Sequence, residues 1–271
     1  MKKNKKKTNK KSFKPVSQQE LLAKMVKKNL GTKIDEIYND EIDLTTNMTC
    51  QCNCCKVAMP QIHYSEFLNI ATYVWAEFSS QEKIELICKS IEYFFKVQFH
   101  KYGKDIFYKP CVFLDKDTNL CKIYDKRPLN CRLYGLWPED MYNARVEGFA
   151  KNFEKFGIKK EDIPLHKQCD KVTRVNNDKP LDKDVIESLE QKLNELDKVV
   201  GGYSKTQIKT AHNYRTFHDW ILLKIYGEKF IYGLSDFLKL SDKEQTDDLL
   251  EKILAEVRTK LSSEGVPNFG E

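Results

Sequence analysis

Cysteines are the residues of this 271-residue chain whose type and spacing most clearly indicate chemistry. Nine are present, and four of them fall within the six residues "CQCNCC": Cys50, Cys52, Cys54 and Cys55. Thiolates are preferred ligands of zinc and of iron–sulfur clusters, and four suffice for a tetrahedral zinc ion or for one cubane cluster. Because the surrounding Thr, Gln, Asn and Lys residues are polar, packing in an apolar core does not explain this group. We therefore predict that these thiols bind metal.

A second group of cysteines lies further along the chain, with nine residues between successive members: Cys111, Cys121 and Cys131. Cys169 follows in "LHKQC" and is a possible additional ligand. Cys88 lies on the apolar face of a predicted helix and is expected to pack in the core. Seven or eight thiolates exceed the needs of a single tetrahedral ion. Either two metal sites are present, or some of these cysteines lie next to the metal ligands without binding the metal, or are redox-active.

The adjacent pair Cys54–Cys55 bears on the kind of site. Adjacent side chains point to opposite faces of a strand and diverge by about 100° around a helix. We therefore expect these two thiols to diverge, which favours a polynuclear cluster or two neighbouring sites over one small ion.

The two cysteine blocks together resemble the YkgJ-type cysteine-cluster family of zinc- or iron-chelating domains, to which flagellin lysine N-methylases also belong. The resemblance rests on "CQCNCC" and on "CVFLDKDTNLCKIYDKRPLNCRLYG", and covers residues 48–135. The matching motif positions are Cys111, Phe113, Leu114, Cys121, Ile123, Tyr124, Arg127, Pro128, Cys131 and Arg132. The first block is C-x-C-x-CC where the family has C-x2-C-x2-CC, so Cys50 and Cys52 compete for the role of first ligand.

Two arginines flank the last cysteine of the second block. Arg127 and Arg132 are predicted to contribute to cofactor binding, by neutralising an anionic thiolate centre and raising its reduction potential. The alternative is that they are surface arginines paired with Asp115 or Asp117. The resemblance and the number of thiols favour an iron–sulfur cluster, with zinc as the alternative.

The elements that must position these thiols are mainly helical. Apolar periodicity and capping-box pairs, in which a Ser precedes a Glu by three residues, predict several helices. They cover residues 17–31, 65–78, 79–103, 182–201, 208–226 and 242–261, the last begun by Ser241 and Glu244. Residues 104–178 contain few periodic stretches, and "WPED" is interpreted as a turn. We expect a mainly α protein in which metal staples a loop-rich region.

Charge and composition suggest three parts. Residues 1–14 contain eight lysines and no acid, whereas the rest of the chain has 38 basic and 40 acidic residues. Residues 1–15 are therefore predicted to be a disordered, solubilising tail, with contact to nucleic acid or another anionic surface as the alternative. Residues 16–178 would form the metal-binding domain, and residues 179–271 a helical region packed on it.

We predict a cytoplasmic metal-binding protein. Reducing conditions there favour metal binding over disulfides, and neither a signal peptide nor a membrane span is evident. One alternative is a metal-dependent, protein-modifying enzyme resembling flagellin lysine N-methylase, with a protein as substrate or partner. The other is a zinc-stapled nucleic-acid-binding protein. The sequence contains no P-loop, G-x-G-x-x-G, G-x-S-x-G or H-E-x-x-H motif, and it identifies no catalytic residue.

Overall fold

The computed structural model describes residues 29–39, 46–48, 54–56, 59–101, 110–154, 157–163, 167–169, 172–174, 181–200 and 215–265. The α-helices of this part are α2 (Leu30–Asn39), α3 (Tyr64–Glu77), α4 (Ser80–Lys101), α5 (Leu129–Arg132), α6 (Glu139–Phe153), α7 (Lys183–Val200), α8 (Phe217–Leu240) and α9 (Lys243–Glu264). Single 3-10 turns are η1 (Cys54–Lys56), η2 (Tyr124–Lys126) and η4 (Lys160–Asp162). The strands are β1 (Thr46–Met48), β2 (Gln61–Ile62), β3 (Val172–Arg174) and β4 (Arg215–Thr216). The fold is mainly α, as predicted.

Local capping explains where several helices begin. The backbone N–H of Ser79 donates to the Glu82 carboxylate at 2.9 Å, and the N–H of Glu82 donates back to the Ser79 hydroxyl at 3.3 Å. This capping box starts α4 where the sequence predicts it. Helix α9 is instead capped by Asp242, whose side chain accepts from Gln245 N–H at 2.8 Å. The predicted capping pair, Ser241 and Glu244, began one residue earlier.

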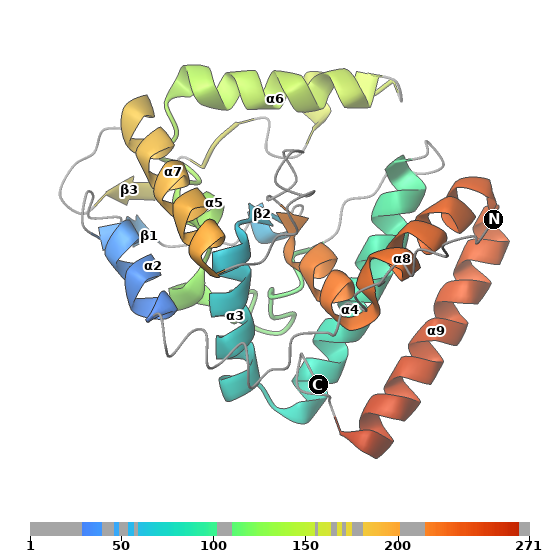
Figure 1. Ribbon diagram of the computed structural model, residues 1–271. Coiled ribbons are helices and arrows are strands. Elements are labelled where there is room, and N and C mark those ends of the chain that lie inside the picture. The colour runs from blue at the N-terminus through green and yellow to red at the C-terminus, as the bar shows by residue number, and fades with distance from the viewer. Residues whose placement is uncertain are drawn as a thin grey trace, which may run out of the picture.

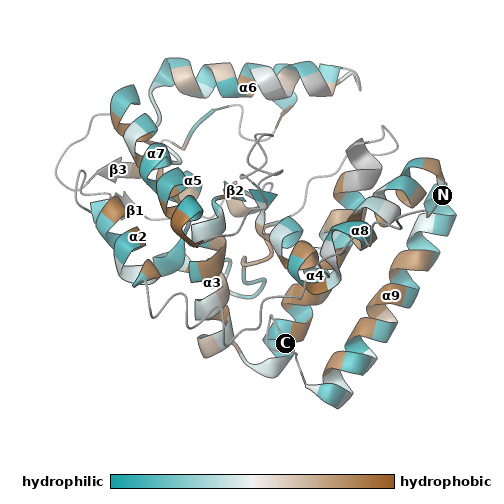
Figure 2. Ribbon diagram, in the orientation of Figure 1, coloured by the Kyte–Doolittle hydropathy of each residue, from teal (hydrophilic) through white to brown (hydrophobic). Residues whose placement is uncertain are grey.

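The helices form two groups that lie side by side (Figure 1). Helix α7 packs against α2 and α3, while α8 and α9 pack against α4. Figure 2 shows hydrophobic stretches on α4 and α8 where these two helices pass each other. The last three long helices therefore cover the earlier ones and are not an independent bundle.

An aromatic cluster joins the two groups to the cysteine-rich loop. Phe67 of α3 lies 5.4 Å from Phe217 of α8, measured between ring centroids. Phe113, two residues after Cys111, meets Phe217 edge-on at 4.6 Å. All three rings are at most 3% exposed, so burial of this apolar surface anchors the loop to the helices.

Two short antiparallel sheets connect distant segments. Strand β1 pairs with β3, with Met48 opposite Val172, and β2 pairs with β4, with Ile62 opposite Arg215. The first sheet brings the backbone just before "CQCNCC" next to the backbone just after Cys169. Met48 and Val172, which bracket the predicted ligands from Cys50 to Cys169, are therefore neighbours.

Three local predictions differ from the structure. Helix α6 lies inside the region expected to be irregular, and "WPED" belongs to its start rather than to an isolated turn. Pro138 is its N-cap residue, and Glu139 and Asp140 stand in its first turn, where acidic residues complement the helix dipole. Gly31, expected to end a helix, lies in the first turn of α2.

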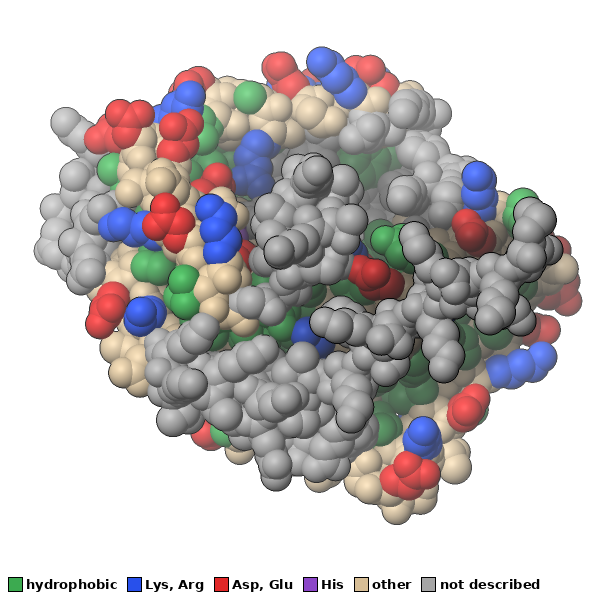
Figure 3. Space-filling model, in the orientation of Figure 1, with side chains coloured by type: hydrophobic (Ala, Val, Ile, Leu, Met, Phe, Trp, Pro, Cys, Tyr) green, Lys and Arg blue, Asp and Glu red, His purple; other side chains and the backbone are tan. Residues whose placement is uncertain are grey.

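Other predictions fall partly outside the described residues. The predicted helix over 208–226 is described only from residue 215, and α8 begins at Phe217 and runs through a kink at Gly227. The lysine-rich segment and both predicted domain boundaries, at residues 15 and 178, lie outside the described residues, as does most of the predicted helix 17–31. On the face drawn in Figure 3, acidic and basic side chains of the described residues are interspersed. No helix in the described ranges has the length and apolarity needed to cross a bilayer.

Candidate metal centre

The first cysteine block is described at its last two members. Cys54 and Cys55 form most of the 3-10 turn η1, and their Sγ atoms lie 4.0 Å apart. This differs from the expected divergence. Adjacent side chains leave a 3-10 turn about 120° apart, so it is the orientation of the side chains beyond the backbone that brings the two sulfurs together. Two thiolates on one tetrahedral zinc ion lie about 3.8 Å apart, since each Zn–S bond is about 2.3 Å. The pair could therefore bind one ion. Cys50 and Cys52 lie outside the described residues.

The second block reaches the first through the backbone. The N–H of Cys111 donates to the carbonyl of Cys55. The chain then turns and returns antiparallel to itself, with Leu114 paired with Cys121 and the N–H of Lys122 donating to Phe113 O at 2.9 Å. The hairpin therefore places Cys111 and Cys121 near its open end, beside the first block.

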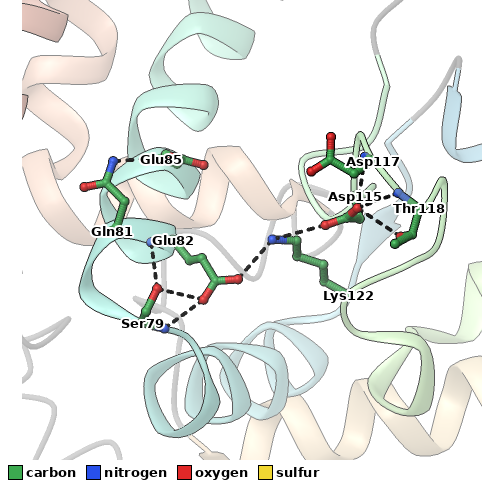
Figure 4. Close-up of polar contacts among 8 residues, drawn as sticks. All are labelled: Ser79, Gln81, Glu82, Glu85, Asp115, Asp117, Thr118 and Lys122. Carbon is green, nitrogen blue, oxygen red and sulfur yellow. Dashed lines mark hydrogen bonds and ion pairs between the residues drawn. The ribbon is translucent and has the colours of Figure 1, made fainter.

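This hairpin is held to α4 by charged side chains (Figure 4). The Lys122 ammonium lies 3.0 Å from the Glu82 carboxylate and 3.4 Å from that of Asp115. Asp115 also accepts from the backbone N–H groups of Asp117 and Thr118, which closes the turn. Asp115 thus pairs with a lysine here, where the sequence had suggested an arginine as its alternative partner.

Cys131 is carried by the four-residue helix α5. Pro128 is the N-cap residue of this helix, and its carbonyl accepts from the N–H of Cys131 at 2.9 Å. Leu129 and Leu133 are 1% and 0% exposed, so apolar packing fixes the helix on both sides of the cysteine. So short a helix has no stability of its own, and tertiary contacts must supply it.

The two predicted cofactor-binding arginines lie in different surroundings. Arg127 stacks on the Tyr124 ring, with its guanidinium carbon 3.7 Å from the ring centroid. The hydrogen bond from Cys55 is the main cause that lowers the pKa of Cys54, and the charge of Arg127 adds to it. Burial is the main cause that raises the pKa of Cys131, and the charge of Arg127 opposes part of that rise. The Arg132 guanidinium lies over the Tyr38 ring and donates to the carbonyls of Arg127 and Asp125 at 2.9 and 2.8 Å. Arg132 therefore braces the backbone before Cys131.

Contacts of its neighbours hold the segment of Cys169 against the stretch that follows Cys131. Lys167 O accepts from the Tyr134 hydroxyl at 3.3 Å, and the Gln168 side chain donates to Trp137 O at 2.8 Å. A close backbone approach at Gly135 completes the contact, because a Cβ added there would lie 2.9 Å from Cys169 O. The charges of Cys54 and Cys169 both act on Tyr134, whose pKa is raised mainly by burial.

The remaining thiols influence one another electrostatically. The pKa of Cys55 is raised by its hydrogen bond to Cys54, by burial, and by the charges of Cys54, Cys111 and Cys131. Burial also raises the pKa of Cys131, as do the charges of Cys111, Cys54 and Cys121. The hydrogen bond from Cys55 lowers the pKa of Cys54 to about 7. Five thiols from both blocks are thus close enough to repel one another as thiolates.

The donor set fits a metal centre. Crowded thiolates are stabilised by a multivalent cation, and all six described cysteines of the predicted site are half-buried and free of disulfides. Cys88 is 5% exposed on α4, as predicted for a core residue. Within the described ranges, no three Cys, His, Asp or Glu side chains are gathered closely around one common point. Metal binding would thus draw the thiols together.

Sequence patterns did not single out four residues that support the centre: Glu66, whose carboxylate accepts from the Leu129 N–H of α5, and Lys122, Gly135 and Phe217. Each acts across a long sequence separation, which periodicity and spacing do not report. Only Glu66 had a local indication, as an acidic residue in the first turn of a predicted helix.

The fold and the cluster define a mainly α protein with a cysteine-rich centre built from loops and short helices. Residues 46–170 match the family model CxxCxxCC, described as "Putative zinc- or iron-chelating domain". The matched range contains all eight predicted ligands, from Cys50 to Cys169, and supports binding of zinc or iron. No curated protein and no solved structure matches the chain significantly.

Proposed function

We propose that this protein binds an iron–sulfur cluster through cysteine thiolates of the two blocks and Cys169. The observation that carries the proposal is that the Cys111 N–H donates to the carbonyl of Cys55, whose Sγ lies 4.0 Å from that of Cys54, so that the backbone joins two cysteine blocks more than fifty residues apart. Five or six thiolates exceed the four that a tetrahedral zinc site uses. Iron–sulfur centres of various nuclearity are held by thiolates alone.

A zinc centre is the second candidate. The 4.0 Å separation of the Cys54 and Cys55 sulfurs favours it, because this distance suits two ligands of one tetrahedral ion. Cys111 and Cys131 would complete such a site, leaving Cys121 and Cys169 beside it. In both cases Arg127 would offset part of the thiolate charge.

The iron–sulfur and zinc candidates are distinguished by purifying the full chain without oxygen and measuring its iron, zinc and acid-labile sulfide, together with its visible spectrum. We expect iron and sulfide in similar amounts and a coloured protein. A colourless protein with stoichiometric zinc and no sulfide would establish the second candidate. Absence of both metals, also after reconstitution with each, would contradict a metal-binding function.

Ligand roles are tested with Cys54→Ser and Cys131→Ser, each expected to lower metal content. Cys88→Ser is the matched control, since this thiol is buried on α4 and interacts with Arg258 of α9. Equal metal content in all three variants would refute the assignment of Cys54 and Cys131. We also propose a reducing, cytoplasmic location, supported by the density of cysteines in the two blocks, because reducing conditions keep thiols available as metal ligands.

A further inference from the structure

The Glu66 carboxylate joins three elements in the protein interior. Glu66 lies in the first turn of α3 and is 2% exposed. Its Oε2 accepts from the backbone N–H of His63 at 2.8 Å, an ordinary capping contact. Its Oε1 accepts from the backbone N–H of Leu129 at 2.6 Å and from the Tyr38 hydroxyl of α2. Capping of α3 needs only Oε2, so the contacts of Oε1 have a different role.

That separate task concerns α5, the short helix that carries Cys131. Leu129 is the first residue of α5, and its N–H has no partner within so short a helix. Next to it, the Asn130 side chain donates to Gln61 O of β2 at 2.7 Å. On the other side of Cys131, the Arg132 guanidinium lies 4.6 Å from the centroid of the Tyr38 ring.

These contacts leave Cys131 with little freedom. The residues before and after it are tied to α2, α3 and β2, and the Glu66 carboxylate binds both α5 and the tyrosine beneath Arg132. A buried carboxylate is costly unless hydrogen bonds satisfy it, and here three donors do so. The carboxylate therefore has a structural reason to stay in place and to hold α5 with it.

We propose that Glu66 is a positioning residue for the Cys131 thiolate in the metal centre, an inference that rests on the proposed function. Groups that orient metal ligands through hydrogen bonds typically change metal affinity 10–100-fold when they are replaced. Glu66→Gln keeps the size of the side chain but replaces one acceptor oxygen by an NH2 group. That group would face a backbone N–H or the tyrosine hydroxyl, so α5 would lose an anchor.

The test compares Glu66→Gln with Asp197→Asn in the full chain. Asp197 is a second buried carboxylate, 0% exposed, whose oxygens accept from Ser65 N–H at 2.7 Å and from Tyr64 N–H at 3.3 Å. It thus caps the same end of α3 from helix α7. Both variants should lower the melting temperature, but only Glu66→Gln should change how tightly the centre holds metal.

Metal dissociation into excess chelator is the first measurement, with the metal found in the wild-type protein. We expect Glu66→Gln to lose metal about 10–100 times faster than wild type, and Asp197→Asn to remain within about twofold of wild type. Equal dissociation rates for both variants would show that Glu66 acts only through general stability. Tyr38→Phe, which keeps the ring beneath Arg132, should give an intermediate rate.

Thiol alkylation in the metal-free protein separates this inference from the proposed function. Iodoacetamide labelling followed by peptide mass spectrometry reports Cys131 and Cys54 in one sample. Glu66→Gln should speed alkylation of Cys131 several-fold and leave Cys54 unchanged, whether or not wild type holds metal. An unchanged Cys131 rate would overturn the positioning role. Absence of metal in wild type, with the labelling result as expected, would overturn only the metal-binding proposal.

Discussion

Gly135 shows how a residue without a side chain can determine where a thiol lies. Its φ is +97°, in the left-handed region that other residues rarely adopt. A Cβ at this position would lie 2.8 Å from Val172 Cβ and 2.9 Å from Cys169 O. Because Gly135 has no side chain, the segment that carries Cys169 can pack directly against it. Both the positive φ and this close contact require glycine here.

Gly135→Ala should consequently destabilise the protein by about 2–4 kcal/mol, combining backbone strain with steric overlap. Urea unfolding measures this free energy. Gly157→Ala is the control, because Gly157 also has positive φ but no atom within 4 Å of an added Cβ. Its expected cost is about 1–2 kcal/mol. Equal costs would mean that the close approach to Cys169 is easily relieved.

His63 gives the protein a pH-dependent contact. Its ring is 2% exposed, and its Nδ1 lies 3.2 Å from Asp197 Oδ2. Burial lowers the pKa of His63, but the hydrogen bond to Asp197 and the nearby carboxylates outweigh burial and raise it above 6.5. A raised pKa in the folded state means that protonated His63 stabilises the fold.

This contribution should be complete below the unfolded-state pKa of about 6.5 and should disappear as pH rises through the folded-state pKa. We expect the stability difference between wild type and His63→Gln to be larger at about pH 6 than at about pH 9. Urea unfolding across this range measures it. A difference that stays constant or grows with pH would contradict the prediction.

At the scale of elements, the hairpin between Cys111 and Cys121 depends on α4 for its orientation. Lys122 connects the two through Glu82 and Asp115, and all three side chains are partly exposed, at 32%, 37% and 24% (Figure 4). Water screens such pairs, so their orienting effect exceeds their contribution to stability.

Lys122→Gln should therefore lower the free energy of unfolding by only about 0.5–1 kcal/mol, measured in urea at moderate salt. Lys183→Gln serves as the control, because its partner Glu187 lies one turn along the same helix and both are more than half exposed. Its effect should be close to zero. A loss of several kcal/mol for Lys122→Gln would show that the bridge behaves as a buried ion pair.

For the whole molecule, the described thiols of the predicted site lie in loops, a 3-10 turn and the four-residue helix α5, whereas the long helices supply most of the buried core. Bound metal stabilises whichever segments supply the ligands, so its removal should loosen those segments first. We expect faster hydrogen exchange at the amides of Cys111, Lys122 and Cys131 after metal removal. Amides of α4 and α8 should keep their protection. Uniform loss throughout the chain would instead indicate that metal controls the entire fold.

Much of the local structure follows from the sequence because its signals are local. Apolar periodicity and the Ser79–Glu82 pair are complete within a few residues, and the helices they predict match α3, α4 and α7 closely. The two cysteine blocks likewise indicate the family that residues 46–170 match. Helix α6 was not predicted, because Pro138, Glu139 and Asp140 at its start are also typical of a turn.

Tertiary structure alone decided which of these parts meet. The contacts of Cys55 with Cys111, of Lys122 with Glu82 and of Glu66 with Leu129 join residues 40 to 63 positions apart. No periodicity specifies such pairs, because they form only when apolar burial has brought the helices together. The sequence by itself therefore determined that the protein has two cysteine blocks and helices to position them. Packing of the helices determined how the thiols face one another.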